Sequence, residues 1–199
     1  MTRTVLLDLG NVVLGIDFRR VFAAWARSAG IDEQRFYDRW AMDEAYEAHE
    51  VGAIDFATYA AALSKRFDVH MPEAAWRAGW NDLWTEPFAG VVQRLPEVAQ
   101  RYGLYGFTNT NESHVEQWRA NYRQELAAFQ HIFVSSEIGR RKPSPDAYRY
   151  VCGEIGTAPA EVLFLDDNLD NVEGALSAGL NAHLVRSEAE VVARLTELL

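Results

Sequence analysis

The sequence predicts an α/β protein: a Rossmann-like, three-layer core around a parallel sheet, with an all-helical domain inserted into it. Two observations predict this fold class. Short apolar runs alternate with helical patterns over most of the chain, which is typical of a parallel sheet covered on both faces. One long stretch near the N-terminus instead has helical periodicity throughout. We therefore assign 1–15 and 89–199 to the core and 16–88 to the inserted helical domain.

The strands of the core are predicted from five short apolar runs. None of them has the polar alternation of a half-exposed strand, so each is expected to be buried on both faces of the sheet. The runs are Thr4–Leu7, Leu104–Phe107, Ile132–Val134, Val162–Leu165 and Ala182–Val185.

Helices are expected between the later strands because capping residues precede the helical patterns there. Asn111, Ser144 and Asn168 can each cap a helix N-terminus, and Ser144 is followed by a proline suited to a first turn. Ser187 opens the last helix. Gly179 is typical of a helix end. The predicted helices cover 88–102, 111–122, 144–155, 168–178 and the residues after Ser187.

The inserted stretch 16–88 contains no convincing strand. Apolar residues from Phe18 to Ala29 recur at helical spacing and stop at Gly30. Further helix starts are indicated by Asp32, Asp55 and Pro72. The stretch holds five of the six tryptophans, so we expect it to form its own aromatic core.

Composition excludes several classes of protein. The net charge of -10 disfavours nucleic acid as a partner, since an anionic surface repels phosphate backbones. The single cysteine, Cys152, rules out an internal disulfide or a zinc cluster built from cysteines. No apolar stretch approaches the ~20 residues that span a bilayer, and no signal-peptide pattern is present. We expect a cytoplasmic monomer or homodimer with no membrane partner.

Reactive side chains follow three of the predicted strands. They are Asp8 after the first run, Thr108-Asn109 after the second and Asp166-Asp167 after the fourth. The carboxyl ends of parallel strands share one edge of the sheet, where ligands bind. Alone, each group is also typical of a helix cap or a turn. Carboxylates that converge on one site repel each other unless a cation is present, and hard oxygen ligands suit Mg²⁺.

A basic run, Arg140-Arg141-Lys142, follows the third predicted strand. It could be a solvated loop. Alternatively, a lysine at this position can reach the same edge of the sheet and neutralise a bound phosphoryl group as a point charge. The second interpretation gains weight from the strand-end carboxylates.

Taken together, these residues resemble the haloacid dehalogenase superfamily of phosphohydrolases, of the kind that carries a helical C1-type cap. The resemblance covers the whole chain. The amino-acid sequences of its motifs are most similar to those of the bacterial subgroup that contains an α-D-glucose-1-phosphate phosphatase. The motifs that carry it, in the order of the family, are Asp8-Leu9-Gly10-Asn11-Val12, Thr108-Asn109-Thr110-Asn111, Arg141-Lys142-Pro143 and Leu165-Asp166-Asp167-Asn168.

The resemblance implies a Mg²⁺-dependent phosphatase that acts on a small phosphorylated metabolite. It implies that Asp8 is the nucleophile and forms an aspartyl-phosphate that water hydrolyses. It further implies that Mg²⁺ is held by Asp8, the Gly10 carbonyl and Asp167, with Asp166 orienting a metal-bound water. Substrate phosphate would be bound by three residues: Thr108, the Asn109 backbone and the catalytic Lys142.

One position departs from the pattern of most phosphatases in the family. They place an aspartate two residues after the nucleophile as general acid and base, whereas this chain has Gly10. A general acid contributes ~10²–10⁴-fold, and its loss matters less for an acidic leaving group such as an anomeric oxygen. We therefore expect a sugar phosphate such as a hexose 1-phosphate as substrate. A replacement acid could come from Asp17, Glu44, His49 or Glu50.

Three alternative functions remain open from the sequence. An L-2-haloacid dehalogenase of the same superfamily would need no metal, which the paired Asp166 and Asp167 disfavour. A phosphotransferase or mutase would need a phosphoenzyme that outlives attack by water. A non-catalytic phosphometabolite-binding protein is disfavoured because Asp8, Lys142 and Asp167 are all present.

Overall fold

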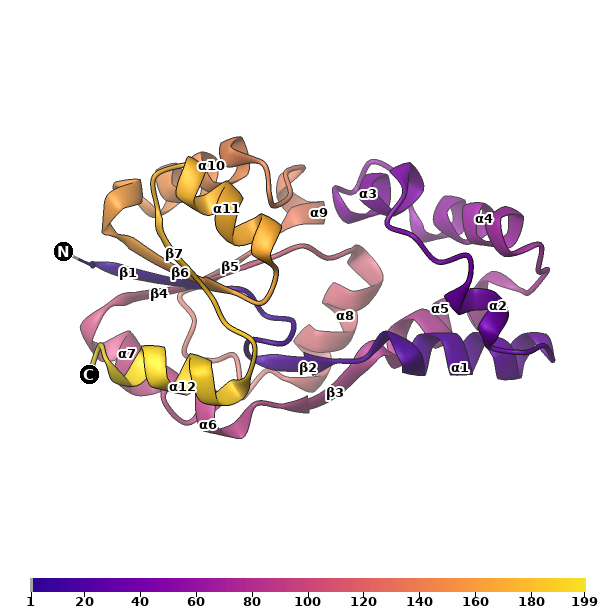
Figure 1. The fold of residues 1–199 in the computed structure, drawn as a ribbon, viewed down its shortest axis with the longest axis horizontal. Helices are drawn as coiled ribbons and strands as arrows, with labels where there is room; N and C mark the ends of the chain where they lie inside the picture. The colour runs from indigo at the N-terminus through magenta and orange to yellow at the C-terminus, as the bar shows by residue number, and fades with distance from the viewer. Residues whose placement is uncertain (1) are drawn as a thin grey trace.

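A five-stranded parallel sheet forms the centre of the protein, whose computed structural model describes residues 2–199. The strand order is β5-β4-β1-β6-β7, so β1 lies in the middle with β4 and β6 on either side (Figure 1). The five predicted strands are all present. Their bounds are β1 (Thr4–Leu7), β4 (Gly103–Thr108), β5 (His131–Val134), β6 (Val162–Asp166) and β7 (Asn181–Leu184).

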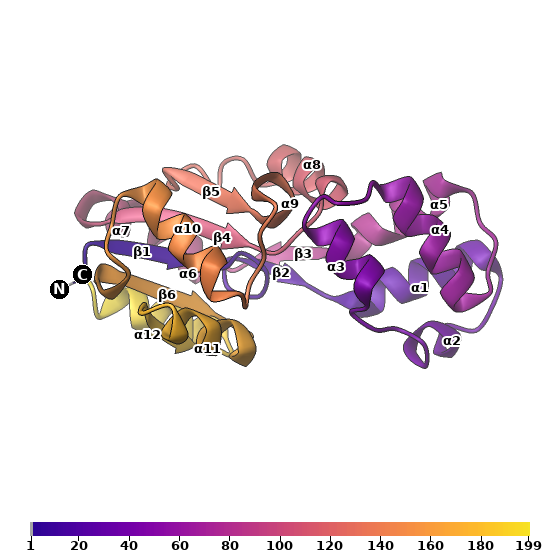
Figure 2. The same ribbon diagram turned by 90° about the horizontal axis from the view of Figure 1, so that it is seen from above.

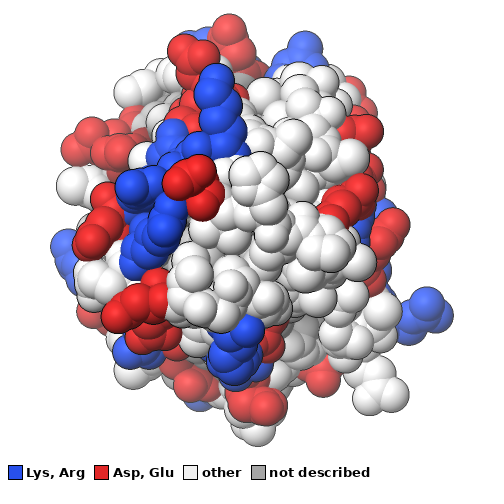
Figure 3. All heavy atoms as spheres, turned by 90° about the vertical axis from the view of Figure 1, so that its right-hand side faces the viewer, with Lys and Arg blue, Asp and Glu red and all other residues white. Residues whose placement is uncertain are grey.

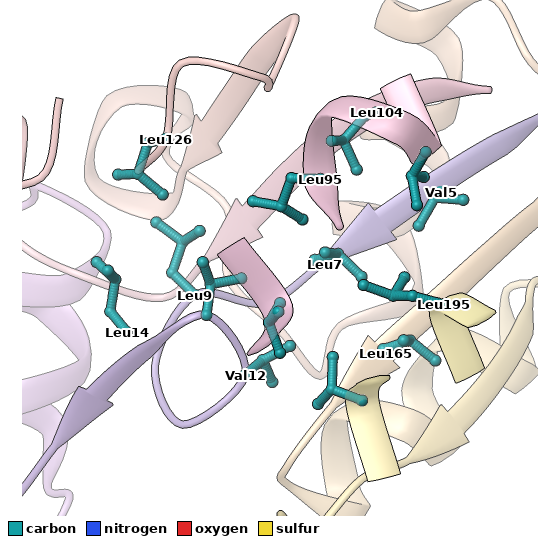
Figure 4. Packing of buried hydrophobic residues seen from close by; sticks show 14 of the residues in the cluster. Val5, Leu7, Leu9, Val12, Leu14, Leu95, Leu104, Leu126, Leu165 and Leu195 are labelled. Carbon is teal, nitrogen blue, oxygen red and sulfur yellow. The ribbon is translucent and has the colours of Figure 1, made fainter. Parts of the chain in front are cut away.

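Helices cover both faces of this sheet, which confirms the predicted fold class. Alternate residues of β1 point to opposite faces: Val5 and Leu7 enter one apolar cluster and Leu6 enters another. On the first face lie α6 (Ala89–Val92), α7 (Leu95–Arg101), α8 (Glu112–Asn121) and α12 (Glu188–Thr196) (Figure 4). On the second lie α10 (Pro145–Ile155) and α11 (Leu169–Ser177) (Figure 1).

The helices of the core begin where the capping residues predicted. Asn111, Asn168 and Ser187 each accept a backbone hydrogen bond at the start of α8, α11 and α12. Ser144 precedes α10 with Pro145 in the first turn, but its side chain makes no capping hydrogen bond, so that part of the prediction is wrong. The single helix expected over 88–102 is wrong, because it is divided into α6 and α7. Pro96 has no N–H to donate, so the hydrogen-bond ladder cannot continue through it.

Two short strands were not predicted. β2 (Leu14–Ile16) and β3 (Trp84–Pro87) pair antiparallel outside the main sheet, so the expectation that 16–88 contains no strand is wrong. Both are short, and β3 is partly exposed and ends in a proline, so they lack the apolar pattern of a buried strand. Together they connect the core to the helices that follow β2 (Figure 2).

The residues between β2 and β3 form a helical insertion, defined here as 18–83. Its own apolar cluster contains Trp25, Trp76 and Trp80, each almost fully buried, and the Trp25 Nε1 donates to the Trp76 carbonyl at 2.9 Å. The division of the chain at 15/16 and 88/89 stays a prediction. The helices are α1 (Phe18–Ala29), α2 (Gln34–Tyr37), α3 (Glu44–Glu50), α4 (Phe56–Phe67) and α5 (Glu73–Trp80), followed by a 3-10 turn over Asn81–Leu83.

The helical insertion contacts the core a second time, away from the β2–β3 ribbon. Gly52, just after α3, has a positive φ of 70° and packs against α9 (Ser135–Ile138), where an added Cβ would lie 2.5 Å from the Ser136 carbonyl oxygen. Only glycine fits that backbone and that approach. The end of α3 is therefore fixed against α9, which directly follows β5.

The outer end of the helical insertion presents a broad area without charged side chains, and Lys and Arg lie beside Asp and Glu around it (Figure 3). On this face a band of Lys and Arg side chains runs along one side of the uncharged area, with Asp and Glu side chains next to it (Figure 3). Within residues 2–199, no helix is both long and apolar enough to cross a bilayer.

Candidate active site

Side chains from three adjacent strands meet at one edge of the sheet. Because β4, β1 and β6 are parallel neighbours, their carboxyl ends bring Thr108, Asp8 and Asp166 together. Thr108 and Asp8 line a cavity of about 580 Å³ between the core and the helical insertion, whereas Asp166 is completely buried and does not line it. Other predicted site residues that line this cavity are Gly10, Asn109, Lys142 and Asp167.

Lys142 is the buried cation of this site. Its ammonium nitrogen lies 2.8 Å from Asp8 Oδ1 and 2.7 Å from Asp166 Oδ2, and its side chain is 1% exposed. A buried charge is expensive unless it is paired and hydrogen-bonded, and two carboxylates meet this requirement here. The residue from the basic loop therefore reaches the strand ends, while its neighbour Arg141 extends to the helical insertion.

Asp166 is completely buried and holds Lys142 in place. Its Oδ1 accepts from the Asn168 backbone N–H at 2.8 Å, and both its carboxylate oxygens lie within 3.1 Å of Asn171 Nδ2. These contacts fix the carboxylate so that Oδ2 faces the ammonium group. Asn171 has no role in the sequence analysis, although its place in the first turn of α11 puts it near the end of β6.

Asn109 joins the second motif to the third. Its side chain donates from Nδ2 to the Lys142 carbonyl at 2.8 Å and accepts at Oδ1 from the Lys142 N–H at 2.9 Å. This pair of bonds fixes the backbone that carries the lysine. Thr108, at the end of β4, is 5% exposed and lines the same cavity.

Three carboxylates crowd this site. One oxygen each of Asp8, Asp166 and Asp167 lies within 4.8 Å of the others. Burial raises the pKa of Asp8 to about 7, with Lys142 opposing that rise and the two neighbouring aspartates adding to it. Burial and Asp166 likewise raise the pKa of Asp167. Such crowding of hard oxygen donors fits a divalent cation, which offsets the repulsion.

Asn11 orients Asp167 through a side-chain hydrogen bond. Its Nδ2 donates to Asp167 Oδ2 at 3.2 Å, and its Oδ1 accepts from the Ile16 N–H. Asn11 has a positive φ of 53°, a conformation that asparagine tolerates better than most residues. The sequence motif contains Asn11, but its pattern does not show which side chain it would contact 156 positions away.

Gly10 stands where most phosphatases of the resembled family carry an aspartate, and a side chain here would press on the end of the Ile16 side chain. An added Cβ would lie 3.2 Å from Ile16 Cδ1, which covers this position. The absence of a side chain at Gly10 is therefore matched by an apolar side chain above it.

His114 lines the cavity but is fully engaged within the protein. Its Nε2 lies 2.9 Å from the Trp80 carbonyl oxygen, which can only accept, so Nε2 carries the proton. Its Nδ1 then accepts from Asn111 Nδ2 at 3.2 Å. The ring also stacks on Trp80 at 4.8 Å. We conclude that His114 links α8 to the helical insertion.

Together, a sheet edge with an aspartate after the central strand, a buried lysine and a carboxylate pair defines a hydrolase with a Rossmann-like core. The chain belongs to the haloacid dehalogenase-like hydrolase family, which it matches over residues 2–179. This confirms the family resemblance; the bacterial subgroup stays a prediction.

Relatives of known activity include several phosphatases. The whole chain aligns with D-ribitol-5-phosphate phosphatase from Bacteroides thetaiotaomicron at 19% identity, covering 99% of that protein. It also aligns over its whole length with drimenol cyclase drtB from Aspergillus calidoustus at 28% identity, where it spans 37% of that longer protein. A sesquiterpene phosphatase, astK from Aspergillus oryzae, is 36% identical over 52% of the chain and 53% of its own length.

Solved structures share the fold. A haloacid dehalogenase family enzyme from Bacteroides thetaiotaomicron in complex with magnesium has a TM-score of 0.80 at 22% identity, covering 94% of each chain. The L-2-haloacid dehalogenase of Xanthobacter autotrophicus has a TM-score of 0.69 at 21% identity, covering 93% of this chain and 78% of that one. The fold alone therefore does not distinguish this chain from a haloacid dehalogenase, so the site residues must do so.

The burial of His114 predicts a loss of stability in acid. Burial lowers the pKa of His114 from 6.5 to about 3, so the unfolded chain binds a proton near pH 6.5 that the folded protein does not bind until far lower pH. The free energy of unfolding should therefore fall from pH 6.5 towards pH 3, by up to about 1.4 kcal/mol per pH unit for this group.

Urea unfolding between pH 7 and pH 4 measures this slope. In a His114→Gln variant the free energy of unfolding should change less steeply with pH, by the equivalent of about one proton, although the stability at pH 7 is reduced. An unchanged slope would show that His114 binds its proton as readily in the folded protein as in the unfolded chain.

Proposed function

We propose that this chain is a Mg²⁺-dependent phosphatase that acts on a small phosphorylated metabolite through an aspartyl-phosphate. The observation that carries the proposal is the position of Asp8. Its carboxylate lies at the cavity, 2.8 Å from a buried ammonium group and within 4.8 Å of two further carboxylates. Phosphoryl transfer through a covalent intermediate requires a nucleophilic carboxylate, a fixed positive charge and a metal site.

The proposed reaction has two steps. An Asp8 oxygen attacks phosphorus, and the bond from phosphorus to the alcohol oxygen breaks as the aspartyl-phosphate forms. Water then attacks the same phosphorus and releases inorganic phosphate and the free carboxylate. Lys142 offsets negative charge on the phosphoryl oxygens in both steps, in a buried site where each electrostatic interaction is stronger than in water.

Binding of the phosphoryl group is assigned to Thr108 and to the Asn109 backbone. Thr108 ends β4 beside the nucleophile-bearing strand. The Asn109 side chain is used to hold Lys142, which leaves its main-chain N–H as the group we assign to a phosphoryl oxygen. Both are held by the sheet edge, so little ordering is needed when substrate binds.

The metal would be held by Asp8, the Gly10 carbonyl and Asp167. A bound Mg²⁺ would neutralise charge on the phosphoryl oxygens and favour the correct alignment of phosphorus with Asp8. Asn11 holds Asp167 towards the site. Asp166 is engaged with Lys142, Asn168 and Asn171, so we assign it to orienting Lys142 and a metal-bound water.

The substrate is proposed to be a sugar phosphate, in particular a hexose 1-phosphate. The cavity of about 580 Å³ is lined by both apolar and polar side chains, which suits a sugar ring with an apolar face and hydroxyl edges. Phosphatases among the relatives, including one named for D-ribitol 5-phosphate, are consistent with a polyol ester. Its apolar lining residues include Ile16, Phe18, Met42, Leu83 and Trp84.

Removing the nucleophile or the metal should abolish hydrolysis. We expect Asp8→Asn to lower kcat by at least about 10³-fold, because the covalent route is lost. We also expect EDTA to inactivate the wild type and Mg²⁺ to restore it. Release of phosphate from p-nitrophenyl phosphate and sugar phosphates measures both effects, with 2-chloropropionate as the control substrate.

Two results would contradict this proposal. Dehalogenation of 2-chloropropionate that is indifferent to EDTA would make the chain a dehalogenase. A phosphoenzyme that accumulates during turnover and passes its phosphate to a second sugar faster than to water would make it a phosphotransferase.

The leaving group should decide the rate among sugar phosphates. An anomeric hydroxyl is more acidic than a primary one, so an anomeric oxygen should leave faster than a primary alkoxide even where the proton donor lies elsewhere than at Gly10. We expect kcat/KM for glucose 1-phosphate to exceed that for glucose 6-phosphate by about tenfold or more. Steady-state rates for the two isomers under identical conditions check this. Equal values would remove the argument for a 1-phosphate and leave the phosphatase proposal intact.

A further inference from the structure

The cavity has one buried carboxylate that the proposed function has not used. Five carboxylates line it: Asp8, Asp167, Asp170, Glu47 and Glu50. The first two belong to the nucleophile and metal site, and Asp170 is exposed at the start of α11. The Glu47 side chain is 54% exposed, whereas that of Glu50 is 6% exposed.

The other candidates for a replacement acid lie elsewhere. Asp17 caps α1 and is paired with Arg19, and it does not line this cavity. Glu44 is exposed in the first turn of α3. His49 lines a separate cavity of about 400 Å³. Of the four residues that the sequence offered, only Glu50 lines the cavity that contains Asp8.

Glu50 is held against the core by its backbone. Its carbonyl oxygen accepts from Ser135 Oγ at 2.6 Å, and the same hydroxyl accepts from the Thr110 N–H at 2.8 Å. Thr110 follows directly on the Thr108-Asn109 segment assigned to the phosphoryl group. The close contact between Gly52 and Ser136 fixes the segment that directly follows Glu50. The position of Glu50 relative to the phosphate site is thus set by the core itself.

The Glu50 side chain is held by Arg141, the neighbour of Lys142. Arg141 Nε and Nη2 each lie 2.9 Å from Glu50 Oε2, and Arg141 Nη1 lies 2.8 Å from Glu47 Oε1. Burial raises the pKa of Glu50, whereas Arg141, Tyr46 and Lys142 lower it. Burial has the larger effect, so the pKa of Glu50 lies above its ordinary value. A carboxyl group in this setting can both release and take up a proton.

We infer that Glu50 is the general acid and base that replaces the side chain missing at Gly10. This inference rests on the proposed phosphatase function. The Glu50 carboxyl gives its proton to the departing alcohol oxygen while the O–P bond breaks and the Asp8 Oδ–P bond forms. The Glu50 carboxylate then takes a proton from the water whose oxygen attacks phosphorus and frees Asp8.

The test compares two esters of similar shape and different leaving groups. Phenyl phosphate needs a proton on its leaving oxygen more than p-nitrophenyl phosphate does, because nitrophenolate is the more stable anion. Glu50→Gln should lower kcat/KM for phenyl phosphate by about 10²-fold and that for p-nitrophenyl phosphate by less than about threefold. The retained activity on p-nitrophenyl phosphate also shows that the variant folds.

Glu47→Gln is the matched control, since Glu47 lies on the same helix and pairs with the same arginine. It should change both rates by less than about threefold. A Glu50→Gln variant that slows the two esters equally, or neither, overturns the role of Glu50. A wild type that hydrolyses neither ester and forms no Asp8 phosphate overturns the proposed function instead, and the role of Glu50 with it.

Discussion

The buried Lys142 is the interaction on which the rest of the site depends. One ammonium group, almost without exposure, is shared between Asp8 and Asp166. Removing one partner of such a buried group typically costs ~3–5 kcal/mol, because a charge is left without compensation. The contacts of Asn109 with the lysine backbone and of Asn171 with Asp166 therefore serve stability and chemistry together.

This arrangement also explains why the sheet has β1 in its centre. Asp8 needs neighbours on both sides: β4 provides Thr108, and β6 provides Asp166. Lys142 arrives from a loop before α10 and is tied to the end of β4. A close approach supports the same loop, since Gly174 of α11 has no side chain and an added Cβ would lie 2.0 Å from the Pro143 carbonyl oxygen.

Local pattern was enough to predict the five core strands and the residues that follow them. Buried parallel strands are short apolar runs, and the residues at their carboxyl ends lie at one edge of the sheet, so fold class predicts that Asp8 and Asp166 share that edge. That their strands are direct neighbours comes from the structure. The side chains that orient the site were not predictable in this way. Asn11 contacts Asp167, and Glu50, one of four candidate acids in the sequence, contacts Arg141; both partners are distant in the chain. Asn171 contacts Asp166 only five positions away. Periodicity carries no information about any of these side-chain contacts. Similarly, the interruption at Pro96 and the short strand β3 depend on backbone hydrogen bonding that the apolar pattern does not record.

The central claim is that the strand-end carboxylates and Lys142 form one site for a divalent cation and a phosphoryl group. The most direct measurement is a crystal structure with Mn²⁺ in place of Mg²⁺ and with inorganic phosphate, in which anomalous scattering locates the metal. We expect one ion at about 2.1 Å from oxygens of Asp8 and Asp167, with phosphate oxygens in hydrogen-bond distance of Lys142 Nζ. The account would be contradicted if the site formed by Asp8, Asp167 and Lys142 stayed empty at saturating Mn²⁺ and phosphate. It would also be contradicted if the ion bound elsewhere on the protein.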